Sequence, residues 1–477
     1  MTDPPFPVPM PCRISRTALA AVLLLASASA SAQDQDSVRA GVTCEESCHR
    51  KRPWLAIAEV LGTNVFVNRF DAWALGASFA DVSLDSWSSN IKLGWEWDEN
   101  AFGTNMFAHP YHGGLYFNAG RSNGLTFWES APLAFLGSWT WEYLGETHRP
   151  ALNDFFMTSF GGIALGEVFH RVATTIRSNT SRGSGRIGRE LAALPLDPLG
   201  AVNRLVRGEW TKVGPNPREH DSAAYVFRFH MGVRFIGDSA GPEQDPSASP
   251  ALMADMSYGA PFDRPYHAPF DYFSVRLQIS PGGGGFNMLN AVGRLYGSDI
   301  NSANSKHRHL FMINQRYDYV NNPAYKFGAQ SVEAGIVSRW RLGGWHLRTK
   351  LTGDGLILGA IDAPFSGVGE RTYDFGPGAG LTADIRLERR GIPLLSWYNR
   401  FEYLHSVSGA SADHFIGLSG LELTVPIARN VGVGAFLTGY ARASRYSDAP
   451  NDDRDLPEAW LFITWTSAND IARMFTK

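Results

Sequence analysis

The stretch YVFRFHMGVR, residues 225–234, alternates between apolar and polar side chains. One face of an extended strand would carry Tyr225, Phe227, Phe229, Met231 and Val233. The opposite face would carry Arg228, His230 and Arg234. Strands of a membrane β-barrel have this pattern, because one face contacts lipid and the other faces a polar interior. The stretch therefore predicts a barrel strand.

Similar segments recur along the rest of the chain. They lie at 252–258, 272–280, 286–296, 310–319, 331–342, 345–353, 375–387, 396–405, 415–425, 431–441 and 459–466. With the first stretch this gives about twelve strands, and even strand numbers are the rule in bacterial barrels. We therefore predict a mainly β fold, a transmembrane antiparallel β-barrel over residues 223–467, followed by a C-terminal tail at 468–477.

The composition agrees with a barrel of this kind. The chain has 49 Gly and 12% aromatic residues, and no apolar stretch of about 20 residues follows the N-terminal region. The formal net charge of −3 gives no basic surface for nucleic acid. Nucleic-acid binding is therefore not expected.

The N-terminus has the pattern of a secretory signal. Arg13 and Arg16 precede an apolar run at 18–26, which ends in the small residues Ala30-Ser31-Ala32. This run is too short to span a bilayer. We predict a signal peptide at 1–32, its cleavage, and a location in the cell outer membrane.

Two cysteines remain after this cleavage, Cys44 and Cys48, in a flexible N-terminal segment at 33–53. A lone pair of thiols in an oxidising compartment predicts a small disulfide loop. A metal site would need more thiolate or imidazole ligands at matching spacing. No metal or cofactor is identified by the sequence.

Residues 54–177 predict a helical subdomain. An apolar helix over 125–144 is followed by a break at Pro150 and a second helix over 151–173, which together form a hairpin. Gly162 and Gly166 leave one face of the second helix open to close packing. Residues 90–98 alternate like a strand, and 178–222 are predicted to be a linker.

Polar residues are unusually dense in this subdomain. The candidate site residues are His109, His112, Glu129, Glu142, Glu146, His148, Asp154 and Glu167. Carboxylates beside histidine can exchange protons or bind a divalent metal. The alternative is a buried polar network that locks a plug-like helical element, in which Glu167 pairs with Arg171 four residues later. No HExxH or GxSxG motif decides between them.

Several longer motifs carry a family resemblance. They are HPYHG (109–113), YFNAGRSNG (116–124), WEYLGE (141–146), NDFFMTSFGG (153–162), FDYFSVRLQI (270–279) and QRYDYVNNPAYKFGAQSV (315–332). With them the chain resembles an uncharacterised family of exported bacterial proteins, domain of unknown function 3943. The resemblance implies a signal-bearing outer-membrane protein, and it implies no particular reaction.

Two functions are consistent with these patterns. The first is an outer-membrane barrel of unassigned activity whose helical element fills or caps the lumen, involved in envelope lipid or solute handling. Its expected partners are outer-membrane lipid and the barrel-assembly machinery during biogenesis. The alternative is an outer-membrane, lipid-modifying hydrolase that uses the His, Glu and Asp cluster. A soluble periplasmic sandwich is disfavoured by the aromatic density of so many strands.

Overall fold

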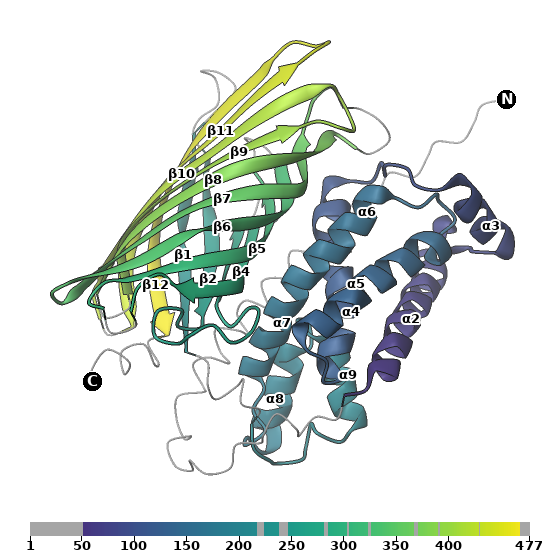
Figure 1. Ribbon diagram of the computed structural model, residues 1–477, viewed down its shortest axis with the longest axis horizontal. Coiled ribbons are helices and arrows are strands. Elements are labelled where there is room, and N and C mark those ends of the chain that lie inside the picture. The colour runs from purple at the N-terminus through teal and green to yellow at the C-terminus, as the bar shows by residue number, and fades with distance from the viewer. Residues whose placement is uncertain are drawn as a thin grey trace.

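The structure, a computed structural model, describes residues 51–216, 224–237, 247–280, 285–302, 305–322, 326–366, 371–389, 392–428 and 430–467. The predicted signal peptide, the Cys44–Cys48 pair and the tail at 468–477 lie outside these residues. The described chain forms a set of helices followed by a β-barrel, and the two lie side by side (Figure 1).

The barrel is closed and antiparallel, and each strand pairs with its neighbours in sequence, with β1 pairing to β12. The strands are β1 Tyr225–Ile236, β2 Ser247–Tyr258, β3 Phe273–Ser280, β4 Gly285–Asp299, β5 Arg308–Asn321, β6 Lys326–Leu342, β7 Trp345–Asp362, β8 Tyr373–Arg389, β9 Ile392–His405, β10 Ala412–Pro426, β11 Val431–Tyr446 and β12 Asp452–Ser467. The prediction of a barrel with about twelve antiparallel strands is confirmed, because each predicted segment overlaps one of these strands.

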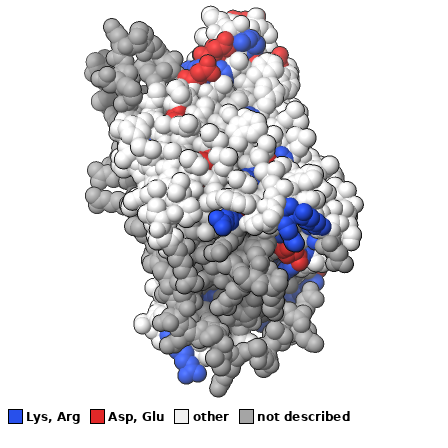
Figure 2. Space-filling view, turned by 90° about the vertical axis from the view of Figure 1, so that its left-hand side faces the viewer, with Lys and Arg blue, Asp and Glu red and all other residues white. Residues whose placement is uncertain are grey.

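The alternation in the strands separates an apolar outside from a polar inside. On β1, Met231 is 57% exposed on the outward face, whereas Arg228 and His230 are buried on the inward face. The free wall, as we call it, consists of exposed outward residues on β8–β12: Leu381, Trp397, Phe401, Leu421, Leu437, Leu461 and Ile463. Figure 2 looks onto the barrel side, and the described surface there is mainly free of charged residues.

Paired charges lie in the interior of the barrel, together with inward apolar side chains such as Trp460 and Phe462. Arg228 on β1 reaches across to Glu422 on β10, with 2.5 Å between Nη1 and Oε1, although these strands are not neighbours. Arg400 pairs with Asp318 at 2.5 Å, and Arg316 contacts both Glu333 and Glu402. Burying charge is costly unless each charge has a partner. Several of these partners stand on strands three or four apart in the barrel, so the described inward side chains occupy the lumen.

The helices precede the barrel in the chain. The α-helices are α2 Pro53–Phe70, α3 Leu84–Leu93, α4 His109–Ser122, α5 Phe127–Thr140, α6 Leu152–Phe156, α7 Gly162–Ile176, α8 Gly183–Ala193 and α9 Pro198–Val206. The shorter helical turns are η2 Asp71–Leu75, η3 Ser78–Ala80, η4 Thr104–Ala108, η5 Trp141–Gly145 and η6 Met157–Gly161. None of the described helices combines the length and the mean hydropathy of a membrane-crossing helix.

One local prediction in this half differs from the structure. Residues 90–98 are not a strand, because α3 continues to Leu93 and ends at Gly94 with a positive φ of 68°. Among the described residues, only an isolated bridge joins Glu96 to Ala151. Within the predicted linker, α8 and α9 fold against each other through Arg204 and Glu190, whose Nη2 and Oε1 lie 2.6 Å apart.

Helices α4 and α7 cross at bare backbone. A Cβ atom added to Gly162 would lie 2.5 Å from the Cα of Gly113, and one added to Gly166 would lie 2.9 Å from Phe117 Cδ1. Both distances are too short for a side chain. The glycines therefore permit a close contact between α4 and α7, which is the use predicted for Gly162 and Gly166.

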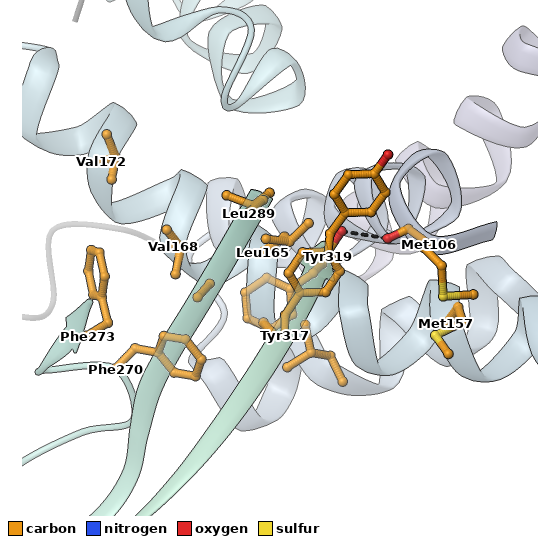
Figure 3. Packing of buried hydrophobic residues seen from close by; sticks show 14 of the residues in the cluster. Met106, Met157, Leu165, Val168, Val172, Phe270, Phe273, Leu289, Tyr317 and Tyr319 are labelled. Carbon is orange, nitrogen blue, oxygen red and sulfur yellow. Dashed lines mark hydrogen bonds between the residues drawn. The ribbon is translucent and has the colours of Figure 1, made fainter. Parts of the chain in front are cut away.

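The helices pack against the outside of the barrel wall. Strand register places Phe227, Met256, Val275, Ala291 and Tyr317 in one outward row across β1–β5. Members of this row share a core with residues of α7 such as Leu165 and Val168 (Figure 3). Polar contacts reinforce this packing, since the Tyr317 hydroxyl donates to the Met106 carbonyl at 2.6 Å. Further along the wall, the ring of Trp97 lies 5.4 Å from that of Phe375 on β8.

The hypothesis that the helical element fills or caps the lumen is therefore wrong. The residues that contact the helices point outward, and the inward positions are already occupied by ion pairs. The polar groups on the apolar helices are buried among the helices themselves. The presence of these polar residues in the sequence therefore does not indicate which side of the barrel wall the helices occupy.

The α4–α7 crossing predicts a size limit at one position. Gly162→Ala places a methyl group against backbone, and overpacking of this kind costs about 1–3 kcal/mol. Gly188→Ala on α8 meets nothing within 4 Å and is the matched control, expected to stabilise its helix slightly. Thermal unfolding followed by helical circular dichroism in detergent should show a lower Tm for Gly162→Ala alone. Equal Tm values would contradict the packing.

The filled interior predicts low conductance. The parent protein in planar bilayers should lack the steps of an open pore, and removal of one cross-lumen pair by Arg228→Ala with Glu422→Ala should raise the conductance. The control is Arg445→Ala with Asp453→Ala, an exposed pair near the end of β11 and the start of β12. Pore-sized steps from the parent would contradict a filled lumen.

Candidate functional site

Two features of the structure could serve a function. The first is a buried or half-buried group of carboxylic acids and imidazoles between the helices, which we call the acid cluster: Asp98, His109, His112, Glu142, Glu146 and Asp154. The second is an apolar cavity between α7 and the barrel wall, which we call the wall cavity. The acid cluster contains five of the eight candidate residues predicted from the sequence.

Glu142 is placed by the π-helical turn η5, which follows α5 and carries the side chain inward. It is fully buried. Its Oε2 accepts a hydrogen bond of 2.7 Å from the backbone N–H of Ala151. Its Oε1 has no hydrogen-bond partner within the described part of the chain. An unpaired oxygen at such a position is expensive if it is charged.

Asp154 lies in the first turn of α6 and faces the start of α4. Its Oδ2 is 3.4 Å from His109 Nε2, and its Oδ1 accepts from Asn153 Nδ2 at 2.6 Å. Asn153 in turn accepts from the backbone N–H of Asp98 at 2.8 Å. Asp98 accepts from Asn105, which also donates to the Tyr373 hydroxyl on β8 at 2.7 Å. The cluster is thus linked to the barrel wall by hydrogen bonds.

His112 lies one turn after His109 on α4. Its Nε2 is 2.9 Å from the Tyr116 hydroxyl, which donates to Asn64 on α2. Its ring meets the ring of Trp141 edge-on, with 5.2 Å between centroids. His112 is therefore held between an aromatic ring and a phenol.

Burial determines the protonation of the cluster. Burial, and next the negative charge of Asp98, raise the pKa of Glu146 to about 8. The pKa values of Glu142 and Asp154 are raised well above their usual range, first by burial and then by neighbouring carboxylates. Burial lowers the pKa of His109 to about 4 and that of His112 to about 3. Near neutral pH the acids named here keep their protons and the imidazoles stay neutral.

His109 Nε2, at 3.4 Å from Asp154 Oδ2, has no hydrogen-bond partner among the described residues. Within the described ranges, no three His, Cys, Asp or Glu side chains are grouped as ligands of a metal ion. Desolvation without a nearby cation makes neutral, hydrogen-bonding groups the stable state. The acid cluster is thus best described as a buried polar network within the helices.

The other three candidates lie outside the acid cluster. Glu129 is exposed and caps α5, where it bonds the Thr126 N–H and pairs with Lys51 at 2.8 Å. His148 is exposed. Glu167 is buried between two arginines, at 2.8 Å from Arg121 and 2.7 Å from Arg171. The structure therefore separates these three residues from the acid cluster.

Three members of the surrounding network were missed from the sequence. Asp98 lies in an aromatic run, WEWDEN, whose alternation favoured a strand. No pattern in the sequence around Asn64 indicates that its side chain belongs to this network. Tyr116 stands four residues after His112, and this spacing on a helix could have identified it as a partner.

The wall cavity lies where α7 and α8 meet the outward faces of β1–β4, and its volume is about 130 Å³. The lining is almost entirely apolar. It consists of Val168, Phe169, Val172, Thr175, Ile176, Arg189, Leu196, Tyr225, Phe227, Ala254, Met256, Val275, Leu277 and Leu289. An apolar cavity of roughly 150 Å³ in another protein stays dry and binds benzene, so this one could hold a short stretch of alkyl chain.

The raised acid pKa values predict a stability that falls as pH rises. In the folded protein Glu146 holds its proton up to about pH 8, whereas the unfolded chain releases it near 4.5. Between about pH 4.5 and pH 8 the folded state therefore binds more protons than the unfolded chain, and the free energy of unfolding decreases as pH rises. Glu146→Gln should raise the Tm relative to the parent at about pH 8 more than at about pH 5. The exposed Glu99→Gln is the control, and equal shifts at both pH values would contradict the prediction.

A search of curated proteins found no match to this chain. Among solved structures, the outer membrane protein OpdK from Pseudomonas aeruginosa is similar at 9% identity and a TM-score of 0.20, covering 51% of this chain and 98% of that chain. The KdgM porin is similar at 11% identity and a TM-score of 0.22, covering 50% of this chain and 98% of that chain. The outer membrane channel DcaP of Acinetobacter baumannii is similar at 6% identity and a TM-score of 0.21, covering 51% and 96%.

Residues 94–199 match the family model described as domain of unknown function DUF3943. The match includes the motifs HPYHG, YFNAGRSNG, WEYLGE and NDFFMTSFGG, and it ends before the barrel. The family resemblance seen in the sequence is thereby confirmed over residues 94–199. These residues, which match the family model, form helices that pack on the outer wall of a twelve-stranded β-barrel.

Proposed function

We propose that the protein is an outer-membrane β-barrel that binds an envelope lipid between its helices and its outer wall. The wall cavity is the observation that carries the proposal. It is apolar, and it lies on the outward face of the barrel, where the wall would otherwise contact lipid. A lipid that enters the wall cavity from the membrane would place an acyl chain in it.

The exposed apolar residues of the free wall support the location of the barrel in a bilayer. Leu437 is 54% exposed, Leu461 60% and Ile463 54%, and they lie on neighbouring strands. Apolar surface costs roughly 25 cal/mol per Å² when it is exposed to water, so a broad apolar wall favours contact with lipid. Export through a signal peptide at 1–32, the Cys44–Cys48 disulfide and insertion by the barrel-assembly machinery stay predictions.

The interior of the barrel favours lipid over solute as the ligand. Arg228, Glu422, Arg316 and Glu333 are buried in the lumen and pair with one another or with further inward charges. A solute path would need these pairs to separate, at the cost of leaving buried charges alone. The wall cavity needs no such change.

The acid cluster gives no support to the alternative of a lipid-modifying hydrolase. Glu142 and Asp154 are at most 2% exposed, and the wall cavity has no acid-cluster residue in its lining. Ser130, which follows Glu129, is fully buried beside Gly120. The acid cluster instead ties the helices to one another and, through Asn105, to Tyr373 on the wall.

Filling the cavity should abolish lipid retention. Ala254 on β2 lines the wall cavity, and Ala254→Leu would occupy it. Ala435→Leu on the outward face of β11 makes the same change on the uncovered wall and is the matched control. Native mass spectrometry of the full chain with added phosphatidylethanolamine should show a one-lipid adduct in the parent and in Ala435→Leu. In Ala254→Leu we expect a decrease of about fivefold or more, a loss of at least about 1 kcal/mol.

All three proteins should show the same change in gel migration when they are heated. This change shows that each barrel was folded before heating. An adduct equally abundant in Ala254→Leu and in the parent would refute lipid binding at the wall cavity.

A further inference from the structure

The helix α2 is apolar on the side that faces away from the protein. Its exposed side chains, together with those of η2, form what we call the α2 face: Trp54, Leu61, Val65, Phe66, Phe70, Trp73 and Leu75. Trp54 is 82% exposed, Phe66 70% and Trp73 80%. These exposed fractions equal or exceed the 54% of Leu437 on the free wall. The α2 face is therefore as open to its surroundings as the wall that we place in lipid.

The polar side chains of α2 point inward instead. Asn64 Nδ2 donates to the Gly137 carbonyl at 3.0 Å, and Asn68 Nδ2 donates to the Gly145 carbonyl at 2.8 Å. Thr63 is also buried. A helix on a water-exposed surface has the opposite arrangement, with polar residues outside and apolar residues inside. This distribution suits a helix whose outer surface is not in water.

The helices also lie at the depth of the barrel wall. They cover Phe227 near the start of β1 and Phe375 near the start of β8. In an antiparallel barrel of consecutive strands, β1 and β8 start at opposite ends. The helical layer therefore extends along the wall between its two ends. A barrel that spans a bilayer would hold these helices beside it, within the thickness of the membrane.

We propose that the α2 face lies in the acyl-chain region of the same bilayer that surrounds the barrel. Figure 1 shows α2 on the side of the helices that is remote from the barrel, so both outer sides of the molecule would meet lipid. Trp54 and Trp73 stand at the two ends of the face, and tryptophan favours the membrane interface. Arg52 precedes the helix and is exposed, so it can reach lipid phosphates.

A bilayer explains the α2 face better than a second protein chain does. Between Trp54 and Leu75 the chain has only Glu59, Arg69 and Asp71 as charged residues, none of them classed as exposed. A protein partner is generally recognised by a polar rim around an apolar centre. The inference rests on the proposed membrane-spanning barrel, and it does not depend on the wall cavity.

Quenching by lipids with a nitroxide on the acyl chain tests the location of the α2 face. The full chain, with its native cysteines replaced by Ser, receives a fluorescent label through Phe66→Cys on the α2 face. Leu437→Cys provides the label on the free wall, and Arg182→Cys provides one at an exposed polar position before α8. Each protein is folded into phosphatidylcholine vesicles, and heat-modifiable gel migration confirms that the barrel has formed.

We expect the label at position 66 to be quenched as strongly as the label at 437, and about threefold more than the label at 182, because quenching needs contact with the acyl chains. Quenching at 437 with none at 66 beyond that at 182 would overturn the inference and leave the barrel proposal intact. An unquenched label at 437 would instead show that the barrel itself is outside the lipid, and both proposals would fail. Val65→Cys gives a second position on the same face, with the same expected result.

Discussion

The ion pairs that cross the lumen are the constraint on which the rest of the structure depends. Arg228 and Glu422 meet from strands three apart in the closed barrel, and Arg316 and Arg400 bind carboxylates of several strands. These charges cannot be separated cheaply once they are buried. Because they occupy the interior, the apolar helices have only the outer wall on which to bury their surface. The same constraint directs any ligand toward the outside of the barrel.

The helical half repeats this division of polar and apolar groups. Its polar side chains, such as Glu142, Asp154 and Asn68, are buried among the helices, and large apolar side chains remain outside. Burial keeps Glu142 and Asp154 protonated, so the acid cluster contains neutral groups joined by hydrogen bonds, whereas Glu167 is held by ion pairs with two arginines. Both halves are thus polar inside and largely apolar outside, as expected for a molecule surrounded by lipid. The wall cavity lies where the two apolar surfaces meet.

The alternation of strand residues predicted the barrel because one face of each strand is apolar throughout. The alternation could not predict where the helices pack. Phe227, which the helices cover, and Met231, which is exposed, both lie on the apolar outward face of β1. The polar groups on the apolar helices suggested that the helices lie in the lumen, because the sequence does not show that these groups are buried among the helices. The alternation of Trp95 and Trp97 suggested a strand, but these rings pack on Tyr143 and Phe375 after α3 has ended. Asp98 was missed because tertiary contacts alone bring it to the acid cluster.

The placement of the helices outside the barrel is tested most directly by a pair of cysteine crosslinks. Gly328 and Ala329 are adjacent on β6, with Gly328 facing outward and Ala329 inward, and a Cβ atom added to Gly328 would lie 3.0 Å from Met106 Cβ. With the native cysteines replaced, Met106→Cys with Gly328→Cys should form a disulfide on mild oxidation, since disulfides need Cβ atoms about 4 Å apart. Met106→Cys with Ala329→Cys should not. A disulfide in the second protein and none in the first would place the helices in the lumen and contradict this account.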